Sequence, residues 1–274
     1  MQISPFDFSA QKRDQRAHNL GQQPQPGDHQ TSARLCDGLS RLKDVHDSLA
    51  YILLLPQTQE SLRRRPDWVE KLLEDFLRFV DVYGIFQTSI MSLKEEHSTA
   101  QMAIRKRDDA KLALYIKHKT KMAKEMDKLA SNVRVIRQNS TIPGSSPTFV
   151  SLGDAELADV IGDVIDATVS VSVALFSGIA TSFASRKTSW IEIVRLSKNT
   201  KKVKKLATEG IKEFRQIGVE SLWGLRKKGD EEVRLISKTM RDLDCCLCSI
   251  ENGSERVFRA LISSRVSLLN THTQ

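Results

Sequence analysis

Apolar residues between Val69 and Ile104 recur in alternating steps of three and four, the spacing of one face of an α-helix. A stripe of this length needs a partner helix to keep it from water. The pattern therefore predicts a long amphipathic helix that packs against others, and Pro66 is well placed to begin it. One member is polar, and the series reads Val69, Leu72, Phe76, Phe79, Tyr83, Phe86, Ile90, Leu93, His97, Ala100 and Ile104.

A similar stripe comes earlier and predicts a helix from about Ser32 to Leu55, with Ser32 as a candidate N-cap and Pro56 as its end. A short amphipathic turn follows it from Thr58 to Arg65. Gly84, inside the longer stripe, marks either a kink or a close crossing with another helix. The earlier stripe consists of Leu35, Leu39, Leu42, His46, Leu49 and Leu53.

A third stripe follows Asp108 and Asp109, two residues that suit a helix cap or a bend. No glycine or proline lies between residues 104 and 112. We therefore expect one long helix with a stutter or mild bend at this point, and a tight hairpin is the alternative. The third stripe consists of Leu112, Tyr115, Lys119, Met122, Met126, Leu129, Val133 and Ile136.

Residues 138–153 form the clearest linker, because prolines, glycines and serines cluster there. After the linker, Asp154 is a candidate cap for a helix with apolar positions at Leu157, Ile161, Val164, Thr168, Val171, Leu175, Ile179 and Phe183.

A further stripe follows Gly229, and we expect it to break near Asn252–Gly253. Its members are Val233, Ile236, Met240, Leu243, Leu247 and Ile250, and the last stretch carries Val257, Leu261, Val266 and Leu269.

Together the stripes predict an all-α fold, a bundle of long antiparallel amphipathic helices. We expect one helical-bundle domain over residues 32–274, with the linker joining its two halves. Residues 1–31 are polar and poor in apolar side chains, so we expect a disordered N-terminal tail. No alternation of strands and helices and no hairpin turn signals appear.

The net charge of +8 is concentrated in residues 186–228, where 13 basic residues stand against four acidic ones. Such a segment suits an anionic partner, either an unknown protein or an anionic membrane surface, although a solvated helix face has the same pattern. Trp190 and Phe214 are too sparse for a base-stacking platform, so no specific nucleic acid is expected. The candidate contact residues are Lys198, Lys201, Lys202, Lys204 and Lys205.

The uncharged stretch Ala167–Ser185 is about long enough to cross a bilayer. Serine and threonine make up much of it, which favours a buried helix packed through small residues over membrane insertion. Anchoring through residues 167–185 is the alternative. We expect an intracellular, cytoplasmic protein, since the first residues lack a secretory pattern, with peripheral membrane association as the other option.

The residues offer little chemistry. Cys245 and Cys248 have the C-x-x-C spacing, but no second ligand pair completes a zinc site. His46 and His97 lie in apolar seams, where a hydrogen-bonded core histidine is the common case, and they could meet if their helices pack. Phosphate-binding glycine loops and nucleophile elbows are missing from the sequence. We expect no catalytic residue, cofactor, metal or small-molecule substrate.

Five stretches of the sequence can be read together, namely Leu39–Gln59, Trp68–Asp75, Val80–Val82, Lys117–Glu125 and the ending Arg265–Asn270, which reads RVSLLN. In combination they resemble the plant-specific Bypass family, over about residues 32–270. The chain departs from the family's usual pattern at Leu20–Pro26, where a serine-rich stretch is replaced, and at Cys245–Cys248.

The resemblance implies a helical protein without known catalytic activity, linked to root and shoot development through control of a mobile signal. It carries no catalytic residues over to this sequence. We therefore expect a non-enzymatic plant regulator that acts through protein or membrane-surface contacts.

Overall fold

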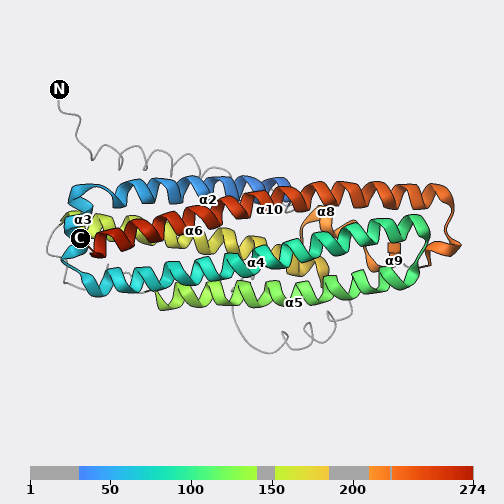
Figure 1. Ribbon diagram of the computed structural model, residues 1–274, viewed down its shortest axis with the longest axis horizontal. Helices are drawn as coiled ribbons and strands as arrows, with labels where there is room; N and C mark the ends of the chain where they lie inside the picture. Colours follow the sequence, from blue (N-terminus) through green and yellow to red (C-terminus); the bar gives the residue numbers. More distant parts are fainter. Residues whose placement is uncertain (1–30, 141–151, 185–209, 223, 274) are drawn as a thin grey trace, which may run out of the picture.

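Five long helices form the body of the protein, and they lie side by side along one axis (Figure 1). The computed structural model describes residues 31–140, 152–184, 210–222 and 224–273. This part of the chain contains no strand, so the predicted all-α bundle is confirmed. The long helices are α2 (Ser32–Leu53), α4 (Pro66–Lys106), α5 (Asp109–Asn139), α6 (Leu152–Phe183) and α10 (Asp230–Thr273).

The long helices pack in a ring in the order α2, α10, α4, α5, α6 and back to α2. Neighbours run antiparallel around most of this ring, but a ring with an odd number of members must contain one parallel pair. That pair is α2 and α10. Ser32 contacts Cys246 and His46 contacts Ser264, so the partners advance together along both helices.

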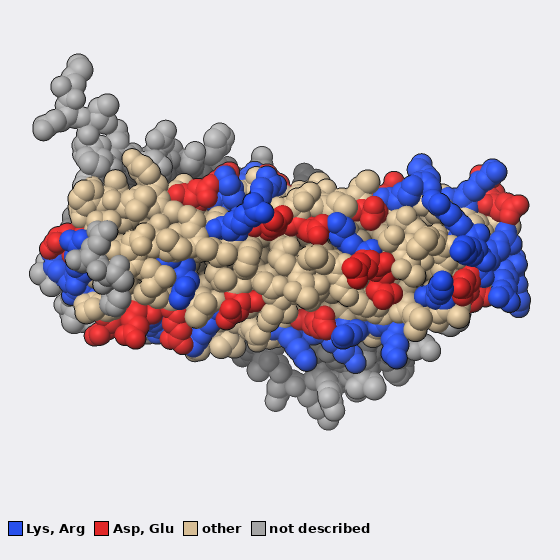
Figure 2. Space-filling model, viewed as in Figure 1, with Lys and Arg blue, Asp and Glu red and all other residues tan. Residues whose placement is uncertain are grey.

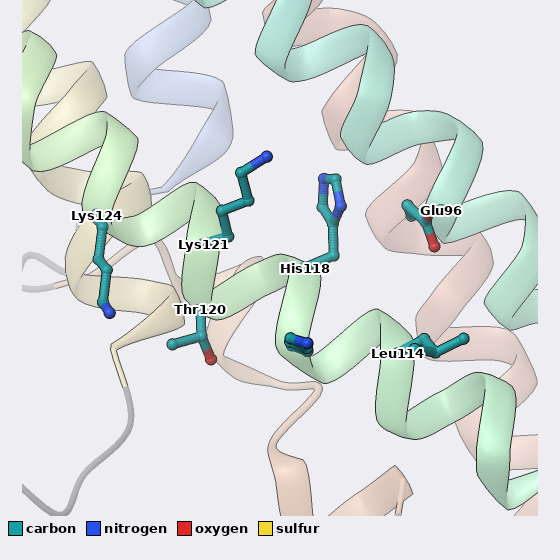
Figure 3. A pocket seen from close by; sticks show the side chains of 7 residues that line it. Glu96, Leu114, His118, Thr120, Lys121 and Lys124 are labelled. Carbon is teal, nitrogen blue, oxygen red and sulfur yellow. The ribbon is translucent and has the colours of Figure 1, made fainter.

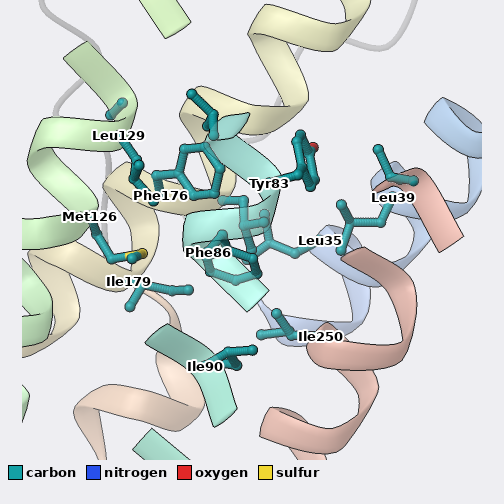
Figure 4. Packing of buried hydrophobic residues seen from close by; sticks show 14 of the residues in the cluster. Leu35, Leu39, Tyr83, Phe86, Ile90, Met126, Leu129, Phe176, Ile179 and Ile250 are labelled. Carbon is teal, nitrogen blue, oxygen red and sulfur yellow. The ribbon is translucent and has the colours of Figure 1, made fainter. Parts of the chain in front are cut away.

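The core consists of the predicted stripes. All eleven positions of the α4 stripe are buried. Burial of apolar side chains supplies most of the stabilising free energy in such a bundle. Tyr83 and Phe86 of α4 point at Phe176 of α6, with ring centroids 5.9 and 5.2 Å apart (Figure 4). Tyr83 also forms a hydrogen bond of 3.0 Å with Ser172, so its buried hydroxyl is satisfied.

His46 is a buried polar joint between three helices. Its Nε2 lies 3.0 Å from Thr168 Oγ1 on α6, and its Nδ1 lies 3.3 Å from Ser264 Oγ on α10. Thr168 donates its own proton to the Val164 carbonyl, so Nε2 must be the protonated ring nitrogen. Burial lowers the pKa of His46 to about 4, which keeps the ring neutral.

His97 forms a second joint, between α4, α5 and α10. Its Nε2 donates to the Met240 carbonyl at 2.8 Å, and its Nδ1 therefore accepts from the Tyr115 hydroxyl, also at 2.8 Å. Burial lowers the pKa of this ring as well. Both histidines are satisfied core residues as predicted. The two rings have different partners and do not meet, and both are fully buried.

The expected continuity between the second and third segments is wrong, and the chain turns tightly there. Helix α4 ends at Arg107, which adopts the left-handed conformation (φ 52°) that usually calls for glycine. Asp108 then caps α5 by accepting from the Lys111 amide. The hairpin was not expected because this stretch has no glycine, but arginine can adopt the left-handed conformation at a cost of about 1 kcal/mol.

The expected break at Asn252–Gly253 is also wrong, because α10 continues to Thr273. Gly253 serves a close crossing instead. A Cβ atom there would lie 3.0 Å from Leu39 Cδ1 on α2. Gly84 likewise lies inside an unbroken helix and faces Phe258 of α10. The register of α10 continues through buried serines, so Val266, expected in the core, is exposed.

Shorter helices complete the bundle. Helix α3 (Pro56–Arg63) follows α2, since Pro56 begins a new helix as well as ending the previous one. Helices α8 (Lys212–Arg215) and α9 (Val219–Leu222) and the 3-10 turn η3 (Leu225–Lys227) lie between α6 and α10 in sequence. We refer to residues 210–228 as the short-helix segment.

The short-helix segment packs beyond the ends of α2 and α6. The Ile211 amide donates to Ser182 Oγ near the end of α6, at 2.7 Å. Glu213 accepts from both the amide and the hydroxyl of Ser32, at 3.1 and 3.0 Å, and so caps the start of α2. Phe214 stacks edge-on against Phe183, with ring centroids 5.3 Å apart.

Lys119 of α5 lies beneath this segment. Its Nζ donates to the Ile217 carbonyl at 3.0 Å and lies 4.7 Å from the centroid of the Phe183 ring. No carboxylate of the described residues pairs with it. Burial lowers the pKa of the amine from 10.5 to about 8. The folded protein therefore holds an amine whose charged form is poorly solvated.

Gly253→Val should destabilise the protein by about 1–3 kcal/mol, because the added methyl groups collide with Leu39 and push α2 away from α10. The free energy of unfolding in urea measures this. Asn252→Val, at the neighbouring exposed position, is the control and should cost well under half as much. Equal effects of the two substitutions would show that the close crossing does not matter.

Lys119→Met should stabilise the protein by about 1–3 kcal/mol at pH 7, because it removes a desolvated charge and keeps the side-chain volume. The pKa of Lys119 is lower in the folded state (about 8) than in the unfolded state (10.5), so unfolded chains bind more protons between these values. Wild-type stability should therefore rise through this window, and the advantage of methionine should shrink by pH 10. Urea unfolding of both proteins at the two pH values tests this. A methionine variant less stable than wild type at pH 7 would contradict it.

Candidate functional site

Basic side chains gather at one end of the bundle, where α4 turns into α5 and α10 begins (right side of Figure 2). Three parts of the sequence meet there: the α4–α5 hairpin, η3 and the first turns of α10. An ion pair between Arg107 and Asp230, 2.5 Å between Nη2 and Oδ1, joins the hairpin to α10. We call this end the basic tip, and its exposed residues are Arg105, Lys106, Lys111, Arg226, Lys227 and Lys238.

The six residues of the basic tip make no ion pair with any described residue. Among the acidic residues of this end, Asp230 pairs with Arg107, Glu232 with Lys228 and Glu231 with Arg234, and Asp108 caps α5. The six basic residues that remain outside these ion pairs give the tip a positive character, which attracts anionic partners.

Two large apolar side chains stand among these charges. Met102 on α4 has an exposed fraction of 54%, and Leu235 on α10 has one of 64%. Exposed apolar groups rimmed by basic ones are typical of surfaces that contact a membrane or another protein. The combination distinguishes the tip from an ordinary solvated helix face.

A second basic surface lies on α5. A shallow groove of about 570 Å³ is lined by Leu114, Thr120, three lysines and His118 of α5, with Glu96 of α4 at one side (Figure 3). The lysines are Lys117, Lys121 and Lys124, within one of the stretches that carry the family resemblance. No hydrogen bond joins His118 to Glu96 in the described part of the chain, so the groove offers no acid–base pair.

The cysteines do not form a metal site within the described residues. Cys245 is exposed, whereas Cys246 is half-buried and its Sγ lies 3.3 Å from the Ser32 hydroxyl oxygen. Burial raises the pKa of the Cys246 thiol, which favours its neutral form. No group of three His, Cys, Asp or Glu side chains in the described ranges could hold a metal ion.

The lysines that the sequence singled out, Lys198, Lys201, Lys202, Lys204 and Lys205, lie outside the described residues. The described end of the same basic segment, residues 210–222 and 224–228, contributes Arg226 and Lys227 to the tip. The sequence missed the rest of the tip, because its residues come from three separate stretches. In the sequence, the one sign of this surface was the adjacent basic pair Arg105 and Lys106 near the end of a predicted helix.

The apolar helix α6 is long and apolar enough to cross a membrane over Gly153–Phe183, and half of its most apolar window is buried inside the bundle. Its polar residues find partners there: Thr168 meets His46, Ser172 meets Tyr83, and Asp166 pairs with Arg137. Such partners are expected of a helix that packs in a bundle core.

Comparison with known proteins gives one family. The family model described as Protein BPS1 matches residues 38–271. Comparisons with curated proteins and with solved structures found no match. The match covers most of the chain, including all of α4, α5 and α6, most of α2 and α10, and the basic tip. The protein therefore belongs to the Bypass (BPS1) family of plant proteins, which is associated with root and shoot development and is not a known enzyme family.

Proposed function

We propose that this protein is a non-enzymatic regulator of root and shoot development that works by docking its basic tip on an anionic membrane surface. The observation that carries the proposal is the set of six exposed arginines and lysines that make no ion pair with another described residue. Family membership supports the regulatory role.

Electrostatics gives the expected strength of docking. A lysine or arginine near an anionic leaflet contributes about 1 kcal/mol. Six such residues can therefore supply about 6 kcal/mol, which corresponds to reversible binding in the range of tens of micromolar. Insertion of Met102 and Leu235 between headgroups would add an apolar contribution that salt does not screen.

We extend the proposal to a second group of lysines because their stretch of the sequence is strongly basic. They are Lys198, Lys201, Lys202, Lys204 and Lys205. This stretch ends a few residues before the short-helix segment, which contributes Arg226 and Lys227 to the tip. Continuous positive charge along the chain at this point would extend the contact.

Charge reversal at the tip should weaken binding to vesicles that contain phosphatidylserine by about 10- to 100-fold, since attraction of two charges becomes repulsion. The variant is Arg226→Glu with Lys227→Glu, and co-sedimentation with vesicles measures the binding. The matched control reverses Arg63 and Arg64, an adjacent pair at the opposite end of the bundle, and should change binding less than threefold.

Two further measurements sharpen the test. Raising the salt concentration from 0.1 to 0.5 M should release most of the protein, because the interaction is screened over about one Debye length. A variant with Lys201, Lys202, Lys204 and Lys205 changed to glutamate separates the contribution of the preceding segment. Unchanged vesicle binding in both the tip variant and this variant would refute docking through these basic residues. Absence of vesicle binding in the wild type would refute membrane docking and leave an acidic protein as the partner to seek.

A further inference from the structure

The short-helix segment is made of elements that cannot persist without support. Helices α8 and α9 have four residues each and η3 has three, far below the length at which a helix is stable alone. The segment holds its shape because five of its apolar side chains are buried in the core, namely Ile211, Phe214, Ile217, Leu222 and Leu225. The short-helix segment therefore folds only when it docks on the long helices.

Docking of this segment buries the Lys119 amine. The one described hydrogen bond that Nζ makes is to the Ile217 carbonyl, which belongs to the segment itself. Undocking would return the amine to water. The segment thus closes over an unpaired cation, and this weakens its attachment relative to the apolar seams between the long helices.

The attachment at the start of the segment is also tight. A Cβ atom on Gly210 would lie 2.9 Å from the Ser182 amide nitrogen and 3.0 Å from its Cα, so only glycine fits against α6 there. Glu213 holds the start of α2 through Ser32. Neither contact takes part in the pairings among α4, α5, α6 and α10.

We propose that α8, α9 and η3 act together as a latch that opens and closes as one unit while the five long helices stay folded. The closed latch places Arg226 and Lys227 beside the α4–α5 hairpin, and the open latch removes them. For its effect on docking the inference rests on the proposed function, because the latch would assemble and dismantle the basic tip. Its opening is a separate claim that can be measured without any partner.

Hydrogen exchange on the full-length protein, read by mass spectrometry at neutral pH, tests the latch. Amides in residues 211–228 should exchange together and at least about 100-fold faster than those in the middle of α4 and α10. Lys119→Met should slow exchange in the latch by at least about tenfold, since closing no longer desolvates a charge, and should leave the middle of α4 unchanged. The matched control is Lys121→Met, since Lys121 is an exposed lysine two residues further along the same helix. It should change exchange neither in the latch nor in the middle of α4.

Gly210→Val should have the opposite effect and hold the latch open, so that residues 211–228 exchange fast. The circular dichroism spectrum should change only by the loss of the short helices. Exchange in residues 211–228 as slow as in α4, or equal effects of Lys119→Met on latch and body, would overturn the latch. Vesicle binding by Gly210→Val then tests the link to the tip. A latch seen by exchange without any vesicle binding in wild type would reject the proposed membrane docking and keep the latch.

Discussion

The long helices of the bundle differ in length, and the arrangement of the other elements depends on this difference. Helices α4 and α10 have 41 and 44 residues, or about 60–66 Å, whereas α2 has 22 and α6 has 32. A closed ring of five helices therefore exists over only part of the long axis. Over the remainder, α4, α5 and α10 need other cover for their apolar faces, and the short-helix segment provides it. The buried Lys119 and the basic tip both lie in this second part.

The two parts of the bundle handle buried polarity differently. In the five-helix part, His46 is neutral and each of its ring nitrogens meets a hydroxyl, so the joint orients three helices without burying a charge. Beneath the short-helix segment, Lys119 meets one carbonyl and two aromatic rings instead. The first arrangement specifies a unique packing. The second reduces the stability of the region next to the tip, in keeping with the latch proposed there.

Spacing alone was sufficient to predict the long helices and their buried faces, because burial of apolar residues dominates the energetics of a bundle. The errors came where one residue type can serve two structures. Gly253 was expected to end a helix, yet it permits α2 to approach α10. Arg107 forms a turn without the usual glycine. The basic tip could not be predicted, since its charges come from stretches more than 100 residues apart, and only the fold brings them together.

The parallel pairing of α2 with α10 also affects how the chain is made. The first and last long helices are neighbours, and α4 packs against α10 as well as α5. When the first two hundred residues have been synthesised, α4 can pack against α5 and α2 against α6, but the faces of α2 and α4 that contact α10 are still uncovered. The bundle therefore closes only after the C-terminal helix emerges, and the nascent chain exposes apolar surface in the meantime. A truncation before residue 230 would yield chains that depend on chaperones and are prone to aggregate.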